Sequence, residues 1–219
     1  MTASLELRTP LTSVSMAVDL LVESAAAKLT DKERELLGAC HEDVQRLRAL
    51  VNDLLDLSKI EAGKLELALE RVQPGFLFDQ ALAVMQPQTE AKNIELKLEV
   101  PEDLPAVQVD PNKIVWVIVN LLANALRHTP EGGHICVKGE RVGGQVQISV
   151  ADDGEGVPYD IQSRIFDKFV QVKRDGSAGG SGLGLAICKE VVRAHRGTIW
   201  LDSVPGQGST FTFTIPIAD

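Results

Sequence analysis

The stretch DPNKIVWVIVNLLANALRH, from Asp110 to His128, predicts a long helix around which the C-terminal part of the chain is organised. Asp110 is a favoured N-cap residue, and Pro111 suits the first helical position, where no backbone N–H donor is needed. Asn120 and Asn124 lie four residues apart, so both side chains share one face of the helix. Because asparagines on helices also make ordinary local hydrogen bonds, this pair gains meaning only from the motifs around it.

Three glycine-containing motifs follow this helix, each at a break between predicted elements. DDGEG (Asp152–Gly156) comes after a strand, and its glycines would let a ligand approach the backbone closely. GGSGLGL (Gly179–Leu185) precedes a helix, and glycine-rich backbone at a helix N-terminus can hold phosphate groups. GQGSTF (Gly206–Phe211) leads into a further strand. Taken singly, each motif also fits a simple turn.

The segments between these motifs predict an α+β fold, with one mixed sheet and helices packed on one of its faces. Gly143 and Gly144 form the turn of a predicted hairpin. We expect helices over 76–92, 110–128 and 183–195, and strands over 94–100, 135–141, 146–151, 198–201 and 210–215.

Residues 1–62 carry a different periodicity, in which apolar residues recur every three or four positions. They are Leu7, Leu11, Val14, Val18, Leu21, Leu37, Cys40, Val44, Leu47, Val51 and Leu54. Thr30 and Glu33 fit a capping box at the start of the second helix. One helical hairpin has too little core to stand alone, so we expect a homodimeric four-helix bundle. The alternative is a helical spacer without chemistry.

The boundary between these regions falls in SKIEAGK (Ser58–Lys64), where Gly63 is expected to end the helix and begin a hinge. We therefore predict three parts: a helical hairpin over 1–62, a linker over 63–72 and an α/β sandwich domain over 73–219.

The composition excludes several classes of protein. A formal net charge of −9 argues against a nucleic-acid partner, because phosphate backbones are bound by clustered Lys and Arg. The three cysteines form no CxxC motif and no zinc-ligand spacing. No apolar run approaches the roughly 20 residues that a transmembrane helix needs.

Six motifs in order resemble the boxes of the bacterial sensor histidine kinase catalytic core. LELRTPLT (Leu5–Thr12) resembles the H box and NLLANALRHTP (Asn120–Pro130) the N box. DDGEG, IFDKF, GSGLGL and GQGSTF resemble the G1, F, G2 and G3 boxes. Their order and spacing match this family from Ser4 to Pro216. The resemblance implies a dimerisation and histidine-phosphotransfer hairpin followed by a Bergerat-type ATP-binding domain.

The resemblance also implies the cofactors, ATP and Mg²⁺, and the residues that bind them. Asn124 would hold the Mg²⁺ ion, with help from Asn120, and Asp152 would accept a hydrogen bond from the adenine amine. The other implied nucleotide-binding residues are Arg127, His128, Gly154, Gly156, Gly180, Gly182, Leu183 and Gly184.

The kind of ATP chemistry is indicated by Asn120. In related ATPases that hydrolyse ATP with water, a Glu four residues before the Mg²⁺-binding Asn acts as general base. An amide at this position cannot take a proton. The resemblance therefore points to phosphoryl transfer to a protein side chain; a stand-alone ATPase or a purely dimeric interaction module is the weaker alternative.

The H box lacks its phosphoacceptor, because Leu5 stands where the family has His. A leucine has no lone pair with which to attack a γ-phosphate. The neighbouring Glu6, the implied base or orienting acceptor, and Thr9, which would orient water for phosphatase chemistry, are both present. Leu5 is then either an engineered block in an otherwise active kinase or the mark of a natural pseudokinase or dimeric signalling scaffold.

The resemblance implies a response-regulator receiver domain as the partner of the homodimer. It also implies a cytoplasmic protein, or the cytoplasmic part of a membrane-anchored receptor, with a sensor or membrane part upstream of these residues.

Overall fold

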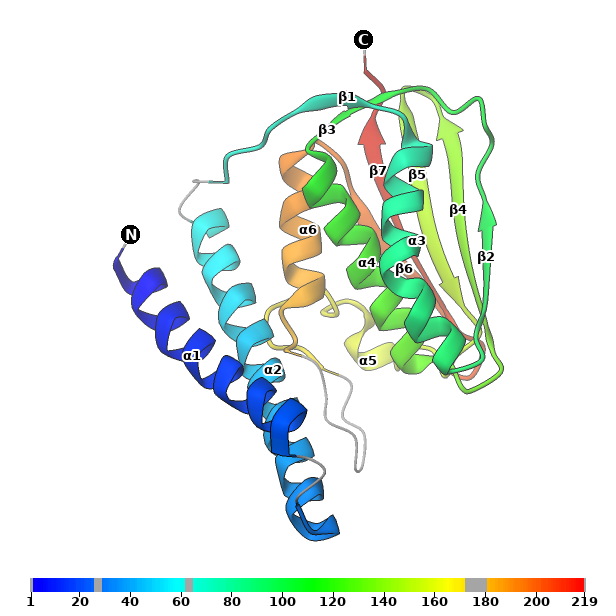
Figure 1. The fold of residues 1–219 in the computed structure, drawn as a ribbon. Coiled ribbons are helices and arrows are strands. Elements are labelled where there is room, and N and C mark those ends of the chain that lie inside the picture. Colours follow the sequence, from blue (N-terminus) through cyan, green and yellow to red (C-terminus); the bar gives the residue numbers. More distant parts are fainter. Residues whose placement is uncertain (1, 26–28, 62–64, 172–180, 219) are drawn as a thin grey trace. The chain divides into compact units, whose positions relative to one another are not determined.

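The computed structural model describes residues 2–25, 29–61, 65–171 and 181–218, which form two compact units, Met1–Lys64 and Leu65–Asp219 (Figure 1). The first unit is a hairpin of α1 (Thr2–Ala25) and α2 (Asp31–Glu61). Gly63, the predicted end of the second helix, lies outside the described residues.

The predicted capping box at the start of α2 is confirmed. Glu33 Oε2 accepts a hydrogen bond from the backbone N–H of Thr30 at 2.9 Å, and the Glu33 N–H donates to Thr30 Oγ1 at 3.4 Å. These two bonds provide partners for N–H groups that lack one at the start of a helix.

A polar cluster joins α1 and α2. Asp19 Oδ1 lies 2.9 Å from His41 Nε2, and Gln45 Nε2 donates to Asp19 at 3.3 Å and to Ser15 Oγ at 3.4 Å. The Ser15 side chain is buried in the hairpin. A specific polar contact between helices is satisfied in one register only, so this cluster fixes how α1 and α2 pair.

The hairpin leaves much of its apolar surface uncovered. Leu11 is buried, whereas other members of the predicted seam remain exposed, as do apolar side chains beside it. The exposed set is Val14, Met16, Leu20, Leu21, Leu36, Leu47 and Leu54. One hairpin therefore buries only part of the surface that its heptad pattern provides.

The second unit is built on a five-stranded sheet in the order β2-β4-β5-β7-β6. The β2–β4 pair is parallel and the other pairs are antiparallel. A separate antiparallel pair joins β1 to β3. The strands are β1 Glu70–Val72, β2 Glu95–Glu99, β3 Val107–Val109, β4 His134–Val142, β5 Gln145–Asp152, β6 Ile199–Ser203 and β7 Ser209–Pro216.

Helices α3 (Pro74–Ala91), α4 (Pro111–His128) and α6 (Gly184–Ala194) cover one face of this sheet (Figure 1). The hydrophobic core lies between these helices and the sheet, because alternate residues of the central strands point towards the helices and are buried. On β5 and β7 these residues are Val146, Ile148, Val150, Phe211, Phe213 and Ile215. The predicted α+β class, the mixed sheet and its single helical face are confirmed.

The predicted elements are present with boundaries shifted by a few residues. The hairpin turn at Gly143 and Gly144 joins β4 to β5 as expected. Asp110 caps α4, with Oδ1 accepting from the Lys113 N–H at 3.2 Å, and Pro111 begins the helix. The short elements β1, β3 and α5 (Tyr159–Gln162) were not predicted from the sequence.

A buried histidine joins the end of α6 to the start of α4. His195 is 3% exposed, its Nδ1 lies 2.8 Å from the Val191 carbonyl, and its Nε2 lies 3.0 Å from the Asp110 backbone nitrogen. Since the Asp110 N–H can only donate, Nε2 accepts and Nδ1 carries the proton. The imidazole is thereby held neutral.

Acid should destabilise the second unit through this group, because burial lowers the pKa of His195. The unfolded chain binds a proton on this imidazole at a pKa of about 6.5, whereas the folded chain binds it only at a lower pH. The free energy of unfolding therefore falls as the pH drops below about 6.5, towards the lower pKa of the folded chain. Between pH 7.5 and 5.5 the free energy of unfolding should fall by about 1 kcal/mol more in the native chain than in His195→Gln. Urea titrations of both chains check this; equal losses would contradict it.

Candidate functional site

The DDGEG loop packs directly against the C-terminal end of α4. A Cβ atom on Gly154 would collide with the carbonyl of His128, so only glycine permits this approach. The Gly154 N–H donates to Asp152 Oδ1 at 3.0 Å. The loop and the helix end that carries Arg127 and His128 are therefore held side by side.

Asp152 ends β5 and is 9% exposed. Burial raises the pKa of this carboxyl, while hydrogen bonds from the backbone N–H groups of Gly154 and Ser209 oppose the rise. A carboxylate held by backbone donors on one side keeps further acceptor capacity, which suits it to bind an exocyclic amine.

The GQGSTF segment does more than turn the chain between β6 and β7. Gly208, at φ 93°, approaches the Asp152 carbonyl so closely that any Cβ would collide with it, and Gly156 approaches Val204 in the same way. The Gly206 N–H also donates to the Glu155 carbonyl at 2.7 Å. This loop therefore fixes the conformation of DDGEG.

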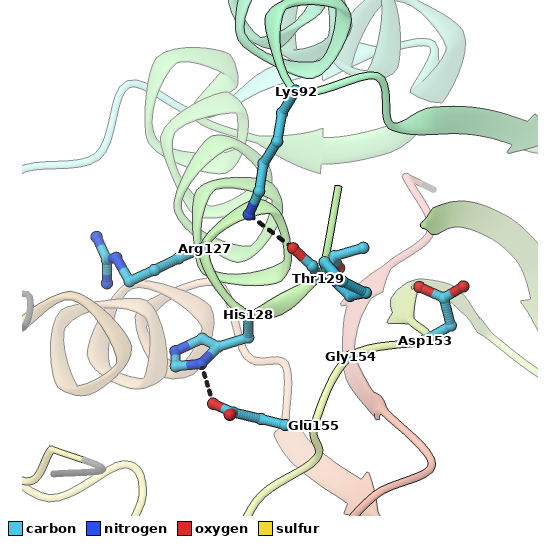
Figure 2. Close-up of a pocket in the computed structure, with 8 residues that line it drawn as sticks. Lys92, Arg127, His128, Thr129, Asp153, Gly154 and Glu155 are labelled. Carbon is cyan, nitrogen blue, oxygen red and sulfur yellow. Dashed lines mark hydrogen bonds and ion pairs between the residues drawn. The ribbon is translucent and has the colours of Figure 1, made fainter. Parts of the chain in front are cut away.

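Two histidine–carboxylate pairs flank the DDGEG loop. His128 Nδ1 lies 2.9 Å from Glu155 Oε1 (Figure 2). On the other side, His134 Nδ1 lies 2.9 Å from Asp153 Oδ2, a contact that raises the pKa of His134. Both acidic residues of the loop that follow Asp152 are thus tied to neighbouring elements.

A pocket of about 440 Å³ opens between the end of α4 and this loop. Figure 2 shows its lining residues, which are Lys92, Arg127, His128, Thr129, Pro130, Asp153, Gly154 and Glu155. Three predicted nucleotide-binding residues, Arg127, His128 and Gly154, belong to this set. The predicted residues outside the lining are Asn120, Asn124, Asp152, Gly156, Gly182, Leu183 and Gly184.

The N-box helix and the start of α6 meet at a second point. A Cβ on Gly184 would lie 2.9 Å from Asn120 Oδ1, and Asn120 Nδ2 donates to the Trp116 carbonyl at 3.1 Å. Gly182, at φ 68°, accepts a hydrogen bond from the Phe169 N–H at 2.8 Å. Leu183 is buried in the core, and a contact of its backbone with nucleotide stays a prediction.

The remaining predicted site residues are only partly described. Gly180 and the side chains of Leu5 and Glu6 lie outside the described residues. Thr9 is exposed on α1, next to Pro10 inside the helix, and its carbonyl accepts from Ser13 Oγ at 3.2 Å. The half-buried Asn124 lies on α4.

Three residues that organise α4 and the loops around it were not predicted from the sequence: Lys92, Ser203 and His195. Ser203 Oγ accepts from the Val157 N–H at 2.9 Å and donates to the Gly208 carbonyl at 2.9 Å, linking the DDGEG and GQGSTF loops. Each of the three residues forms a hydrogen bond with a segment far away in the sequence, so no local sequence pattern could predict its role.

Comparisons with known proteins agree with this architecture. Residues 109–219 match the model of histidine kinase-, DNA gyrase B- and HSP90-like ATPases, and residues 2–63 match the His Kinase A (phospho-acceptor) domain. Within the described residues, every helix is too short or too polar to span a lipid bilayer.

The similar proteins are sensor kinases. The chain is 43% identical over 215 residues to the alginate biosynthesis sensor protein KinB of Pseudomonas aeruginosa, covering 98% of the chain and 36% of KinB. It is 37% identical over 215 residues to the adaptive-response sensory kinase SasA of Synechococcus sp. (strain JA-3-3Ab), covering 97% and 57%. The chain thus spans about a third to just over half of these relatives.

A solved structure shows the same fold over nearly the whole chain. Full-length ShkA in complex with AMPPNP aligns with a TM-score of 0.83 at 34% identity, covering 99% of this chain and 45% of ShkA. Together with the two family matches, this shows that the chain belongs to the histidine kinase family and forms a two-component sensor kinase core, with a phospho-acceptor helical region followed by an ATPase domain.

Proposed function

We propose that this chain binds ATP with Mg²⁺ at the end of α4, against the DDGEG loop and the start of α6. The observation that carries the proposal is the buried Asp152 carboxylate, held beside the N-box helix by the close approach of Gly154 to His128. An ATP-binding family model over residues 109–219 supports it.

The side chains fit this ligand. Asp152 accepts the adenine amine, and Arg127 at the pocket contacts phosphate. Backbone N–H groups of Gly182 and Gly184, at the start of α6, bind phosphates where the helix dipole favours negative charge. Asn124 offers Mg²⁺ a hard amide oxygen, and this ion commonly takes few protein ligands beside substrate phosphates. Titration calorimetry with ATP, with and without Mg²⁺, tests the proposal; absence of binding overturns it.

In its His-containing form the core would phosphorylate position 5 and pass the phosphoryl group to an aspartate of a response regulator. Leu5 removes the nucleophile and so blocks the first step. Dephosphorylation of a receiver needs only a docked surface and a positioned water, for which the exposed Thr9 hydroxyl remains. The chain would therefore keep phosphatase activity. The second candidate, with which Leu5 is equally compatible, is an ATP-binding pseudokinase scaffold.

We propose that residues 1–62 and 73–219 act as separate domains and that the first forms the dimer. The uncovered apolar side chains of the hairpin, including Val14 and Leu47, support this arrangement, because a second hairpin would bury them. A fragment starting at Glu66 would then be monomeric and still bind ATP.

Val14→Glu should weaken the dimer by at least about 100-fold, since a symmetric dimer would bury two unpaired carboxyl groups, each at a cost of roughly 1–3 kcal/mol even when protonated. Val142→Glu is a matched control: Val142 is 50% exposed and Val14 49%, but Val142 lies at the β4–β5 turn. Sedimentation equilibrium of the native chain and both variants measures the dissociation constants. A monomeric native chain at micromolar concentration would rule out the bundle.

A further inference from the structure

Lys92 follows α3 and binds the end of α4. Its Nζ donates to the Leu126 carbonyl at 2.7 Å. It also donates to the Thr129 carbonyl at 2.6 Å (Figure 2). Carbonyls at a helix C-terminus lack helical partners and carry partial negative charge, so an ammonium group there is favourable on both counts. Hydrogen bonds from a charged donor are also stronger than neutral ones.

The residues next to Lys92 hold the loop that follows α4. Asn93, at φ 53°, donates through Nδ2 to Glu131 Oε1 at 3.1 Å, and the Glu95 N–H donates to the Gly133 carbonyl at 3.0 Å. The segment from Lys92 to Glu95 therefore binds the end of α4 and its loop at several points.

The two carbonyls that Lys92 binds bracket the residues that matter for the site. Arg127 and His128 lie between them in sequence and line the same pocket as Lys92. Gly154 of the DDGEG loop is pressed against the His128 carbonyl. A change in this helical turn would displace Arg127 and His128, and it would also release the packing that holds Asp152 and Gly154.

We propose that Lys92 is a positioning residue of the nucleotide site. Its ammonium group fixes the last turn of α4 and, through it, Arg127, His128 and the DDGEG loop. The role rests on the proposed nucleotide binding, but it concerns a contact within the protein that exists before nucleotide arrives.

The test compares Lys92→Met, which keeps the length of the side chain but removes its donors and charge, with Lys92→Arg, which keeps both. Lys97→Met is the matched control, because the Lys97 side chain is 65% exposed on β2 and pairs with Glu99 at 2.6 Å. Two quantities are measured on the full chain: MgATP affinity by titration calorimetry, and amide hydrogen exchange of residues 126–134 without nucleotide.

We expect Lys92→Met to bind MgATP about tenfold more weakly and to exchange these amides faster. Lys92→Arg should stay within about threefold of the native affinity, and Lys97→Met should match the native chain in both measurements. If Lys92→Met does not fold, Lys92→Gln takes its place; its shorter, uncharged side chain should also weaken MgATP binding and speed exchange of these amides.

Two outcomes overturn the proposal. Weaker binding with unchanged exchange would make Lys92 a direct ligand of the nucleotide. Faster exchange with unchanged affinity would make it a stabilising residue alone. If the native chain binds no MgATP, the proposed function fails, and the exchange data decide separately whether Lys92 holds the turn.

Discussion

Leu5→His should turn a chain that takes no label from γ-labelled ATP into one that is phosphorylated on residue 5. The imidazole supplies the missing lone pair, and Glu6 beside it can orient the ring or accept its proton. Incorporation of label should rise from background to a level set only by how well the ATP-binding domain delivers the γ-phosphate. The phosphoryl group should be acid-labile and base-stable, as expected of a phosphoramidate. The matched control is Leu5→Gln, which is polar but not nucleophilic.

A phosphorylated receiver distinguishes the two readings of the native chain. If the phosphatase function is retained, the native chain accelerates the decay of labelled receiver, and Thr9→Ala does so less without any change in ATP affinity. Equal acceleration by both chains would remove Thr9 from the reaction. If neither chain accelerates decay of a receiver that accepts phosphate from Leu5→His, the pseudokinase scaffold is the better reading.

Asp152→Asn should weaken ATP binding roughly 10- to 150-fold, because a lost hydrogen bond to a buried charged acceptor costs about 1.5–3 kcal/mol. The asparagine oxygen can still accept from the Gly154 N–H. The side-chain NH₂ group of the asparagine would then face the adenine amine, and two donors cannot form a hydrogen bond with each other. The substitution therefore changes recognition while it keeps the loop in place.

Titration calorimetry with ATP and inosine triphosphate measures this effect. Inosine carries an oxygen where adenosine has its amine, so Asp152→Asn should lose affinity for ATP and hold or gain affinity for inosine triphosphate. The control is Asp202→Asn. Asp202 is an exposed acid on β6 that accepts a hydrogen bond from Trp200 Nε1, so its substitution removes the same charge and should leave both affinities unchanged. Unchanged ATP affinity in Asp152→Asn would show that another group reads the base.

Features that depend on neighbouring residues could be read from the sequence. The Asp110 cap, the Thr30–Glu33 box and the Gly143–Gly144 turn each act within three residues, and all three are present. The glycine motifs could be placed for the same reason, since each marks a break between two elements.

Features that depend on distant residues could not. The strand pair β1–β3 joins two three-residue segments, too short for any periodicity to show. Lys92 and His195 look like ordinary residues at helix ends until the fold brings Thr129 and Asp110 to them. A turn at GQGSTF could likewise be predicted. Its close contact with Asp152 could not, because that contact requires β5 and β7 to be neighbours.

That contact has a consequence for how the protein is made on the ribosome. Strand β7 lies between β5 and β6 in the sheet, although its residues are synthesised after both. A nascent chain that has emerged only as far as Val204 holds the complete DDGEG sequence but lacks Gly208 and Ser209, which fix its shape. Under the proposed function, nucleotide would then find no formed adenine site until β7 is inserted, and ATP would stabilise only chains whose sheet is complete.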